Sequence, residues 1–320
     1  MGTVPIMTSA IETFGLTKRY GSTTAVTDLS LRVEQGQVFG FLGPNGAGKS
    51  TTIRMLLALQ RPTAGRAVLL GLDAAADSVE VHRRVGYLPG DLELFPRLTG
   101  RQHIAWFARA RGVDTGSLAR QLADRFGVVA DRPVRELSKG NRQKIGLVLA
   151  FMHQPELLIL DEPTSGLDPL MQHEFESLLR ETVAEGRTVF LSSHELDEVQ
   201  RIADRIAIIK SGKLVAEDTV DGLRRAAPQK IEVRFPCSVD PAELSALKGV
   251  TVTGSNGTRV TLDVAGEIAP VLKIIASHDP VELISRPPGL DELFLGFYRD
   301  SPPGQSPPGQ SPRGEASRAH

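Results

Sequence analysis

A glycine-rich segment at residues 43–51, GPNGAGKST, constrains the fold of this chain more than any other stretch. The apolar residues 38–42 before it are typical of a buried strand, and the residues after it have the apolar spacing of a helix. Strand, glycine-rich loop and helix in this order match the pattern G-x-x-x-x-G-K-[ST]. Its glycines let successive backbone N–H groups point inward, next to the positive N-terminal end of the helix. The segment therefore predicts a phosphate-binding loop.

Two side chains of this loop have distinct expected roles. Lys49 is expected to reach the β- and γ-phosphates of a nucleotide, and the Ser50 hydroxyl is expected to hold Mg²⁺. The other predicted nucleotide contacts come from the same loop: Gly43, Asn45, Gly46, Gly48 and Thr51. The alternative interpretation is a glycine-rich turn between a strand and a helix that binds no ligand, because short motifs also occur by chance.

Further apolar runs indicate an α/β fold. Residues 157–160, 188–191 and 206–209 are continuous apolar runs of strand length, which suit parallel strands covered on both faces. Helical spacing separates these runs, and strands that alternate with helices favour an α/β sheet. Alternating apolar and polar residues at 11–18 and 29–33 predict two antiparallel strands as well. We therefore expect a mixed sheet with an antiparallel β portion.

Polar residues follow the apolar runs, where open α/β sheets bind ligands. Asp161 and Glu162 follow one run, and His194 follows the next. Hydrolysis of a nucleoside triphosphate needs a phosphate cradle, a metal ion, a group that orients water and a group that neutralises charge on the γ-phosphate. We expect Asp161 to hold Mg²⁺, directly or through water, Glu162 to polarise the attacking water and His194 to contact the γ-phosphate. Taken singly, the acidic pair could instead cap a strand, and the histidine could lie in a surface turn.

The pattern changes near residues 226–230, and a second domain is predicted beyond them. The expected order there is β-α-β-β-α-β, typical of a small ferredoxin-like α+β domain, with a hairpin turn at Asn256-Gly257 and a last helix at 290–298. The predicted organisation is a disordered N-terminus at 1–10, a main domain at 11–227 with a helical subdomain at about 92–154, an accessory domain at 228–299 and a disordered tail rich in Pro, Gly, Ser and Gln at 300–320.

Composition excludes several classes of function. The chain has 37 basic and 38 acidic residues, so no overall field draws it to nucleic acid or anionic lipid. The single Cys237 excludes an intramolecular disulfide framework and a cysteine-only zinc site. No stretch approaches the ~18 to 20 apolar residues of a membrane span, and the N-terminus lacks a secretory signal pattern. We expect the chain in the cytosol unless a membrane partner holds it.

The order of these motifs resembles the nucleotide-binding subunits of ABC transporters over about residues 11–223. The likenesses follow the family's order: Tyr20 to its adenine-stacking aromatic residue, 43–50 to its Walker A motif, 137–141 to its signature motif, 157–162 to its Walker B motif with the catalytic glutamate, 165–168 to its D-loop and Ser193-His194 to its switch histidine. The resemblance implies a P-loop NTPase core of the ABC ATPase type, which binds ATP and Mg²⁺ and hydrolyses ATP.

The signature-like segment also has a physical interpretation. Ser138 is a favourable N-cap for the following helix, whose positive end would form a second anion site with Gly140 and Asn141. In the family this site and the phosphate loop lie on separate subdomains and meet across a head-to-tail dimer, with ATP between the two subunits. The resemblance thus implies a homodimer in which Ser138, Gly140, Asn141 and Asp168 contribute to nucleotide binding.

Two departures from the family pattern stand out. After residues 87–89 the family usually has a glutamine that senses Mg²⁺ and the attacking water, whereas this chain has Gly90-Asp91. We hypothesise that Asp91 or Glu93 takes over part of that role, or that the sensing is weaker. The signature-like segment also carries Lys139 for the usual glycine and Asn141 for the usual glutamine. Asn141 keeps an amide donor, and Lys139 either adds charge near the γ-phosphate or points to water.

The C-terminal extension and residues 87–100 resemble the drug- and antibiotic-exporting group of the family. That resemblance implies an exporter motor on a separately encoded multi-span permease, peripheral on the cytoplasmic face of the cell membrane. The alternative is a soluble ABC ATPase that acts on the ribosome or on DNA. Ribosomal members usually carry two ATPase units in one chain and repair members a long coiled coil, and the near-zero net charge argues against a polyanionic partner.

Overall fold

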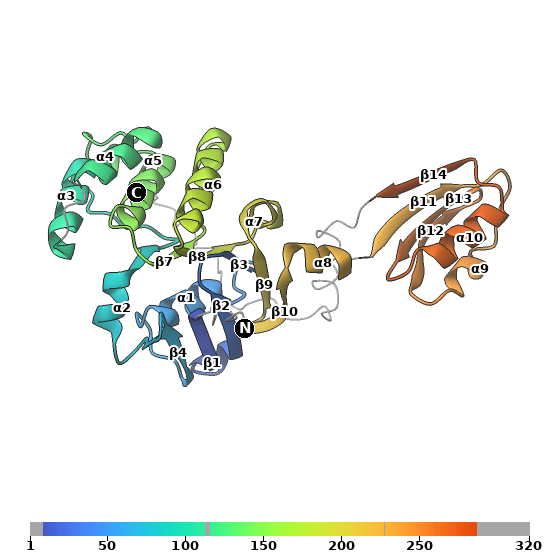
Figure 1. Ribbon diagram of the computed structural model, residues 1–320, viewed down its shortest axis with the longest axis horizontal. Coiled ribbons are helices and arrows are strands. Elements are labelled where there is room, and N and C mark those ends of the chain that lie inside the picture. Colours follow the sequence, from blue (N-terminus) through green and yellow to red (C-terminus); the bar gives the residue numbers. More distant parts are fainter. Residues whose placement is uncertain (1–8, 113–115, 227, 287–320) are drawn as a thin grey trace, which may run out of the picture. The chain divides into compact units, whose positions relative to one another are not determined.

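The computed structural model describes residues 9–112, 116–226 and 228–286 (Figure 1). The chain divides into two compact units, one ending at Arg225 and the other beginning at Ala226. Each unit is described by itself. Most of the N-terminal segment predicted at 1–10, the helix predicted at 290–298 and the tail predicted at 300–320 lie outside the described residues.

The N-terminal unit contains the expected antiparallel sheet. Four strands lie in the order β2-β1-β4-β5, with bounds β1 Ser9–Tyr20, β2 Thr23–Glu34, β4 Ala64–Leu69 and β5 Leu72–Asp73. The strands predicted at 11–18 and 29–33 are confirmed as β1 and β2, and each observed strand is longer than the predicted range. Apolar side chains of β1 and β2 pack together with those of β3 and of the helix after the glycine-rich loop. This core holds the glycine-rich loop between the antiparallel sheet and the sheet that contains β3.

A six-stranded sheet forms the centre of the same unit, in the order β10-β9-β3-β8-β7-β6. Its bounds are β3 Val38–Leu42, β6 Val85–Leu88, β7 Leu157–Asp161, β8 Thr188–Ser193, β9 Arg205–Lys210 and β10 Lys213–Thr219. The strands are parallel except for β10, which pairs antiparallel with β9. Every residue of β3, β7 and β8 is buried, as the continuous apolar runs predicted.

Helices connect the parallel strands and flank the sheet (Figure 1). They are α1 Lys49–Leu56, α2 Ser78–Arg84, α6 Pro169–Ala184 and α7 Leu196–Ile202, while α8 Val220–Ala226 follows β10. The α/β class is thereby confirmed. Among the described residues, none of the helices combines the length and apolar character that crossing a membrane demands.

The helical subdomain consists of α3 Gly100–Arg111, α4 Gly116–Arg125, the short 3₁₀ helix η1 Val134–Glu136 and α5 Lys139–Phe151. Thr99 and Gln102 form a reciprocal capping box at the start of α3. A helical pattern from residue 92 was expected, but residues 92–98 are not helical. The Thr99 cap, which satisfies the first backbone donors of α3, explains why the helix begins only at Gly100.

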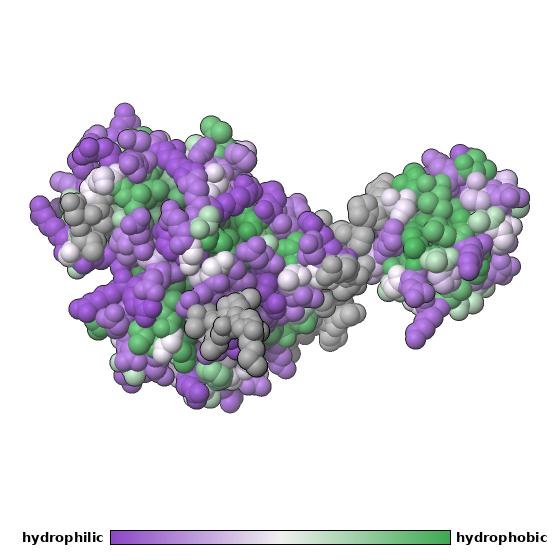
Figure 2. All heavy atoms as spheres, in the orientation of Figure 1, coloured by the Kyte–Doolittle hydropathy of each residue, from purple (hydrophilic) through white to green (hydrophobic). Residues whose placement is uncertain are grey.

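The C-terminal unit has the expected element order. Its elements are β11 Gln229–Arg234, α9 Pro241–Ser245, β12 Val250–Asn256, β13 Arg259–Val264, α10 Ala269–Ser277 and β14 Glu282–Arg286, and the sheet order is β12-β13-β11-β14. The hairpin turn differs by one position from the prediction, because Asn256 still pairs with Arg259 and the loop is Gly257-Thr258. Figure 2 shows apolar residues gathered on the visible face of this unit.

Candidate active site

The glycine-rich loop lies between the end of β3 at Leu42 and the start of α1 at Lys49. Gly48 has a φ of 108°, and a Cβ atom there would lie 2.6 Å from the carbonyl oxygen of Ala25 on β2. Only glycine fits such a position. The loop borders a cavity of about 160 Å³ whose lining comes from β2, the loop, the first turn of α1 and the loop after β7: Ala25, Pro44, Asn45, Gly46, Gly48, Lys49, Ser50, Thr51 and Glu162.

Lys49 places a buried cation beside this cavity. Its side chain is 5% exposed, and Nζ donates hydrogen bonds to the carbonyl oxygens of Gly43 at 2.6 Å and Pro44 at 3.2 Å. Nζ also lies 3.5 Å from Oε1 of Glu162. Burial lowers the pKa of Lys49, while the charges of Glu162 and Asp161 act in the opposite direction. A buried ammonium next to free space is suited to an anionic ligand.

Neighbouring strand ends bring the predicted acidic residues to the loop. The sheet order places β3 beside β8 and β8 beside β7, so their carboxyl ends meet at one edge. Asp161, the last residue of β7, is 4% exposed and accepts a hydrogen bond from the Ser192 hydroxyl. The backbone N–H of Glu162 donates to the carbonyl oxygen of Ser192 at 3.1 Å. Glu162 has a φ of 49°, an uncommon left-handed conformation at the point where the chain leaves the sheet.

The Glu162 carboxylate lies between two basic groups. Its Oε1 is 3.5 Å from Lys49 Nζ and 3.2 Å from Nδ1 of His194, which follows β8 and is 44% exposed. A carboxylate in this position could accept a proton from water while the neighbouring groups stabilise charge that develops on a phosphate. The structure thus brings together the loop lysine and both residues predicted to be catalytic.

The signature-like segment forms the start of α5. Ser138 is the N-cap, and its hydroxyl accepts a hydrogen bond from the Asn141 backbone N–H at 3.2 Å. The side chain of Asn141 is buried, with Oδ1 accepting from Val129 N at 2.9 Å and Nδ2 donating to Val129 O at 3.2 Å. The Asn141 amide therefore holds the preceding loop in place, and its expected contact with a nucleotide stays a prediction.

The N-terminal part of α5 also contacts the loop that follows Glu162. Lys139 is exposed, and its Nζ donates to the Ser165 hydroxyl at 2.8 Å. Gln143 Nε2 donates to Pro163 O at 2.8 Å. A Cβ atom on Gly140 would lie 2.4 Å from Gly166 O, which leaves room only for glycine. The signature-like and D-loop-like segments therefore form one surface.

Relatives of known type share sequence with most of this chain. Residues 26–165 match the ABC transporter family. The chain is 32% identical over 304 residues to the Nod factor export ATP-binding protein I of Cupriavidus pinatubonensis, covering 91% of each chain. It is 39% identical to the daunorubicin/doxorubicin resistance ATP-binding protein DrrA of Streptomyces peucetius, covering 79% of each chain. The chain belongs to the ATP-binding subunits of ABC transporters.

A solved structure agrees with this membership. The ATP-binding subunit of an ABC transporter aligns with a TM-score of 0.61 and 31% identity, over 68% of this chain and 92% of that one. The chain is therefore an ATPase that binds ATP. The P-loop core of ABC ATPase type expected from the motif order is confirmed.

Tyr20 and Asp168 are two further residues of this ABC ATPase that the sequence predicts to bind the nucleotide. Tyr20 ends β1 and is 45% exposed, and Lys18 Nζ lies over one face of its ring, 5.3 Å from the centroid. Adenine stacking on this ring stays a prediction. Asp168 is the N-cap of α6 and accepts a hydrogen bond from the Met171 backbone N–H at 3.0 Å. This bond gives Asp168 a local structural role alongside its predicted role in nucleotide binding.

Gly90 stands where the family usually has glutamine. A Cβ atom there would lie 3.3 Å from Asp161 Oδ2, so the backbone approaches the Asp161 carboxylate unusually closely. Asp91 is exposed and follows directly. Glu93 is also exposed, and its side chain lines a separate groove together with residues of α3 and α5. Position therefore favours Asp91 over Glu93 as the substitute for the glutamine.

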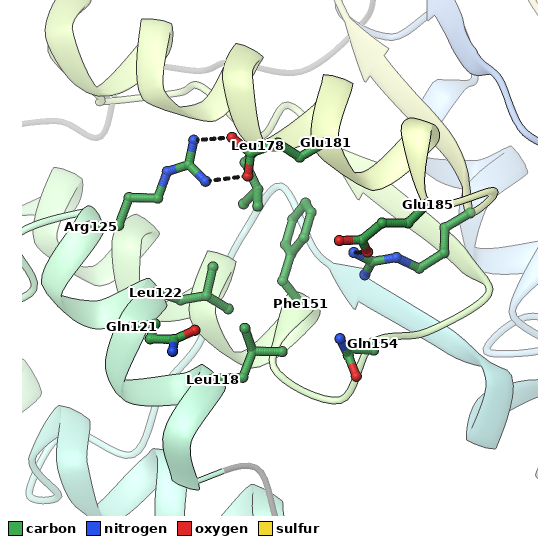
Figure 3. A pocket seen from close by; sticks show the side chains of 10 residues that line it. Leu118, Gln121, Leu122, Arg125, Phe151, Gln154, Leu178, Glu181 and Glu185 are labelled. Carbon is green, nitrogen blue, oxygen red and sulfur yellow. Dashed lines mark hydrogen bonds and ion pairs between the residues drawn. The ribbon is translucent and has the colours of Figure 1, made fainter.

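A second pocket of about 240 Å³ lies among α4, α5 and α6 (Figure 3). Arg125 of α4 forms two hydrogen bonds with the Glu181 carboxylate of α6, at 2.6 and 2.9 Å. The lining of this pocket contains none of the residues predicted from the motifs. We assign it a structural role, because the bidentate pair joins the helical subdomain to the α/β core.

Sequence reasoning missed Ser192 and Gln143, which hold Asp161 and the loop after Glu162. Both residues act through contacts with segments 19 or more positions away. The local signals were weak. Ser192 is a polar residue at the end of an otherwise apolar strand, and Gln143 is a buried glutamine one turn into α5.

Proposed function

We propose that the chain is the ATP-hydrolysing motor subunit of an exporter for a drug, an antibiotic or another secondary metabolite. The position of the Glu162 carboxylate between Lys49 and His194 carries the hydrolytic part of the proposal. Both curated relatives described above are named for export or for drug resistance. These names support an export function for this chain and leave its cargo open within that class.

Mg²⁺ would complete the site as a hard cation that prefers oxygen ligands. The donor set fits, because the Ser50 hydroxyl lines the cavity and the buried Asp161 carboxylate lies at the adjoining strand end. We propose that Ser50 and Asp161 hold the ion, and that Asp91 contributes through water. Bound Mg²⁺ neutralises charge on the phosphates, while Glu162 orients the attacking water and His194 contacts the γ-phosphate.

A homodimer would supply the other half of each site. The cavity beside Lys49 is lined by β2, the phosphate loop, α1 and Glu162, whereas Ser138 and Gly140 lie on the helical subdomain. We propose that these two residues of one chain face the phosphate loop of a second copy. The exposed Asp168 would lie at the same interface. In this arrangement ATP holds the dimer closed and hydrolysis releases it.

A separately encoded multi-span permease is the second proposed partner, which would place this chain on the cytoplasmic face of the membrane. A groove of about 360 Å³ suits a helical segment of such a permease, because most of its lining is apolar: Leu57, Leu59, His82, Val85, Tyr87, Pro89, Leu92, Glu93, Leu94, Phe107, Arg111, Gly146 and Leu149. Pro89 and residues 92–94 line part of the groove, and Gly90 between them approaches the Asp161 carboxylate. Its occupant could therefore sense the nucleotide site. Residues 228–299 are proposed as an accessory domain.

Deletion of the gene in its host, followed by measurement of sensitivity to a panel of lipophilic antibiotics, tests the proposal. The deletion should raise sensitivity to at least one compound, and the wild-type chain should restore resistance while Glu162→Gln should not. Unchanged sensitivity to the whole panel, together with co-sedimentation of the chain with ribosomes, would instead favour the soluble alternative. Recovery of the chain with membranes distinguishes the two outcomes independently of the cargo.

A further inference from the structure

Glu198 on α7 is a buried carboxylate that the functional roles above leave unused. Its side chain is 5% exposed. Oε1 accepts a hydrogen bond from the Thr164 hydroxyl at 2.8 Å, and Oε2 accepts one from the Ser193 hydroxyl at 2.7 Å. Each carboxylate oxygen therefore holds one hydroxyl group.

These two hydroxyls belong to the two segments that carry the proposed catalytic residues. Thr164 lies two positions after Glu162, in the loop that follows β7, and Ser193 directly precedes His194 at the end of β8. The side chains of Glu162 and His194 on the same two segments approach to 3.2 Å. A single carboxylate thus connects the two loops behind the active site.

The environment of Glu198 offers little other reason for a buried carboxylate. Burial raises the pKa of Glu198, whereas the hydrogen bonds from Ser193 and Thr164 lower it. The nearby Arg201 directs its guanidinium Nε to Glu176, at 2.9 Å. A carboxylate held mainly by hydroxyls gains less than one paired with a cation, and its desolvation is costly. Placement of the two loops is a benefit that could offset this cost.

We propose that Glu198 is a positioning residue for ATP hydrolysis, which fixes the relative placement of Glu162 and His194 through Thr164 and Ser193. The proposal rests on the catalytic roles proposed for those two residues. Small displacements of reacting groups reduce rates strongly, whereas nucleotide binding depends on the loop around Lys49. Loss of Glu198 should therefore lower kcat and leave KM for MgATP nearly unchanged.

Glu176 provides a matched control for a merely structural role. It is also a buried carboxylate, 7% exposed, and it anchors α7 through Arg201. Its remaining ionic contacts are with His173 and Arg180 on α6. Glu176→Ala should destabilise the packing of α7 about as much as Glu198→Ala does, without altering the two loops.

The test compares steady-state ATPase kinetics and Tm of the purified full chain with Glu198→Ala, Glu198→Gln and Glu176→Ala. We expect Glu198→Ala to lower kcat about tenfold at nearly constant KM, and Glu198→Gln, which can still bond both hydroxyls, to recover much of that loss. Glu176→Ala should keep kcat near the wild-type value even where its Tm falls. Equal kcat values for Glu198→Ala and Glu176→Ala would overturn the proposal.

Two hydroxyl variants keep the test decisive if Glu198→Ala does not fold. Ser193→Ala and Thr164→Val should each lower kcat, and their combination should lower it by less than the product of the single effects, because both act through one carboxylate. Wild-type kcat in both single variants would also overturn the proposal. Glu162→Gln, measured alongside, reports separately on the catalytic site: if it retains wild-type ATPase, the assignment of that site fails rather than the positioning role.

Discussion

The phosphate loop before α1 and the signature-like start of α5 are both helix N-termini, yet they are built differently. The loop has a buried cation in Lys49 and a catalytic candidate, Glu162, at its cavity. At the start of α5, the Lys139 and Asn141 side chains bond to Ser165 and Val129 of the same chain. The first helix end thus combines a buried cation with a cavity inside one chain, whereas the named side chains of the second are bonded within their own chain.

This difference fits the homodimer proposed above, in which the two sites complement each other. The α5 end is fixed to the loop after Glu162 by Gln143 and by the close approach of Gly140 to Gly166. A nucleotide held between the phosphate loop of one chain and the α5 end of another would therefore be linked to the loop after Glu162 in each of the two chains. Changes in the phosphate-loop half should affect chemistry most, and changes in the α5 half should affect closure.

Replacing Glu162 by Gln should have the largest effect. The amide keeps the shape but cannot accept a proton, so ATPase activity should fall by a factor of about 100 or more while ATP binding persists. Glu156→Gln, at the opposite end of β7 in an ion pair with Arg84, is the matched control and should retain activity. Measurement of phosphate release and of nucleotide affinity separates the two effects. Loss of ATP binding in Glu162→Gln would contradict the assigned role.

Replacing Ser138 by Ala should have the next largest effect and tests the α5 half. Loss of the N-cap should cost about 1 kcal/mol of stability, and loss of a phosphate contact should lower kcat about tenfold. Asp240→Ala removes the corresponding cap of α9, where the carboxylate accepts from Ala242 N at 2.9 Å. The control should lose stability and keep its ATPase rate. Equal ATPase rates in Ser138→Ala and Asp240→Ala would show that the start of α5 takes no part in the ATP site.

Asp91→Ala should lower kcat by a factor of a few, because Asp91 lies next to the close contact between Gly90 and Asp161. Glu93→Ala should leave the rate unchanged, since Glu93 lines the separate groove. Steady-state ATPase assays over a range of Mg²⁺ concentrations distinguish a metal effect from a general one. Unchanged rates in both variants would show that neither carboxylate replaces the usual glutamine.

The last effect is on stability rather than on ATPase rate, and it concerns the junction between the two halves. His153, after α5, lies with Nε2 3.3 Å from Val85 O, and burial, with the Arg111 charge second, lowers its pKa to about 4. Between its ordinary pKa and this value, only the unfolded chain binds the proton, so the free energy of unfolding falls as pH decreases. His153→Gln should reduce the loss between pH 7 and pH 5 by about 1 to 2 kcal/mol in denaturant titrations.

The exposed His173 supplies the control substitution for this pH prediction, and His173→Gln is measured in the same denaturant titrations. An unchanged pH dependence in His153→Gln would mean that this histidine does not titrate as its burial implies.

Local patterns predicted the phosphate loop, the buried strands and the residues that follow them. These features depend on short-range rules, such as the continuous apolar run of β7 that ends in Asp161 and Glu162. Strand β10 was missed, because its exposed and half-buried residues lack a clear apolar face. The contacts of Lys139 and Glu198 were also beyond prediction, since each depends on a partner brought near by the fold.

Light scattering of the full-length Glu162→Gln chain tests the central claim most directly: one chain holds half of each ATP site, and a second copy completes it. With ATP and Mg²⁺ the variant should have the mass of two chains, and with ADP it should have the mass of one. Adding Ser138→Ala to the same chain should weaken the dimer. A single-chain mass at saturating ATP would contradict the shared site.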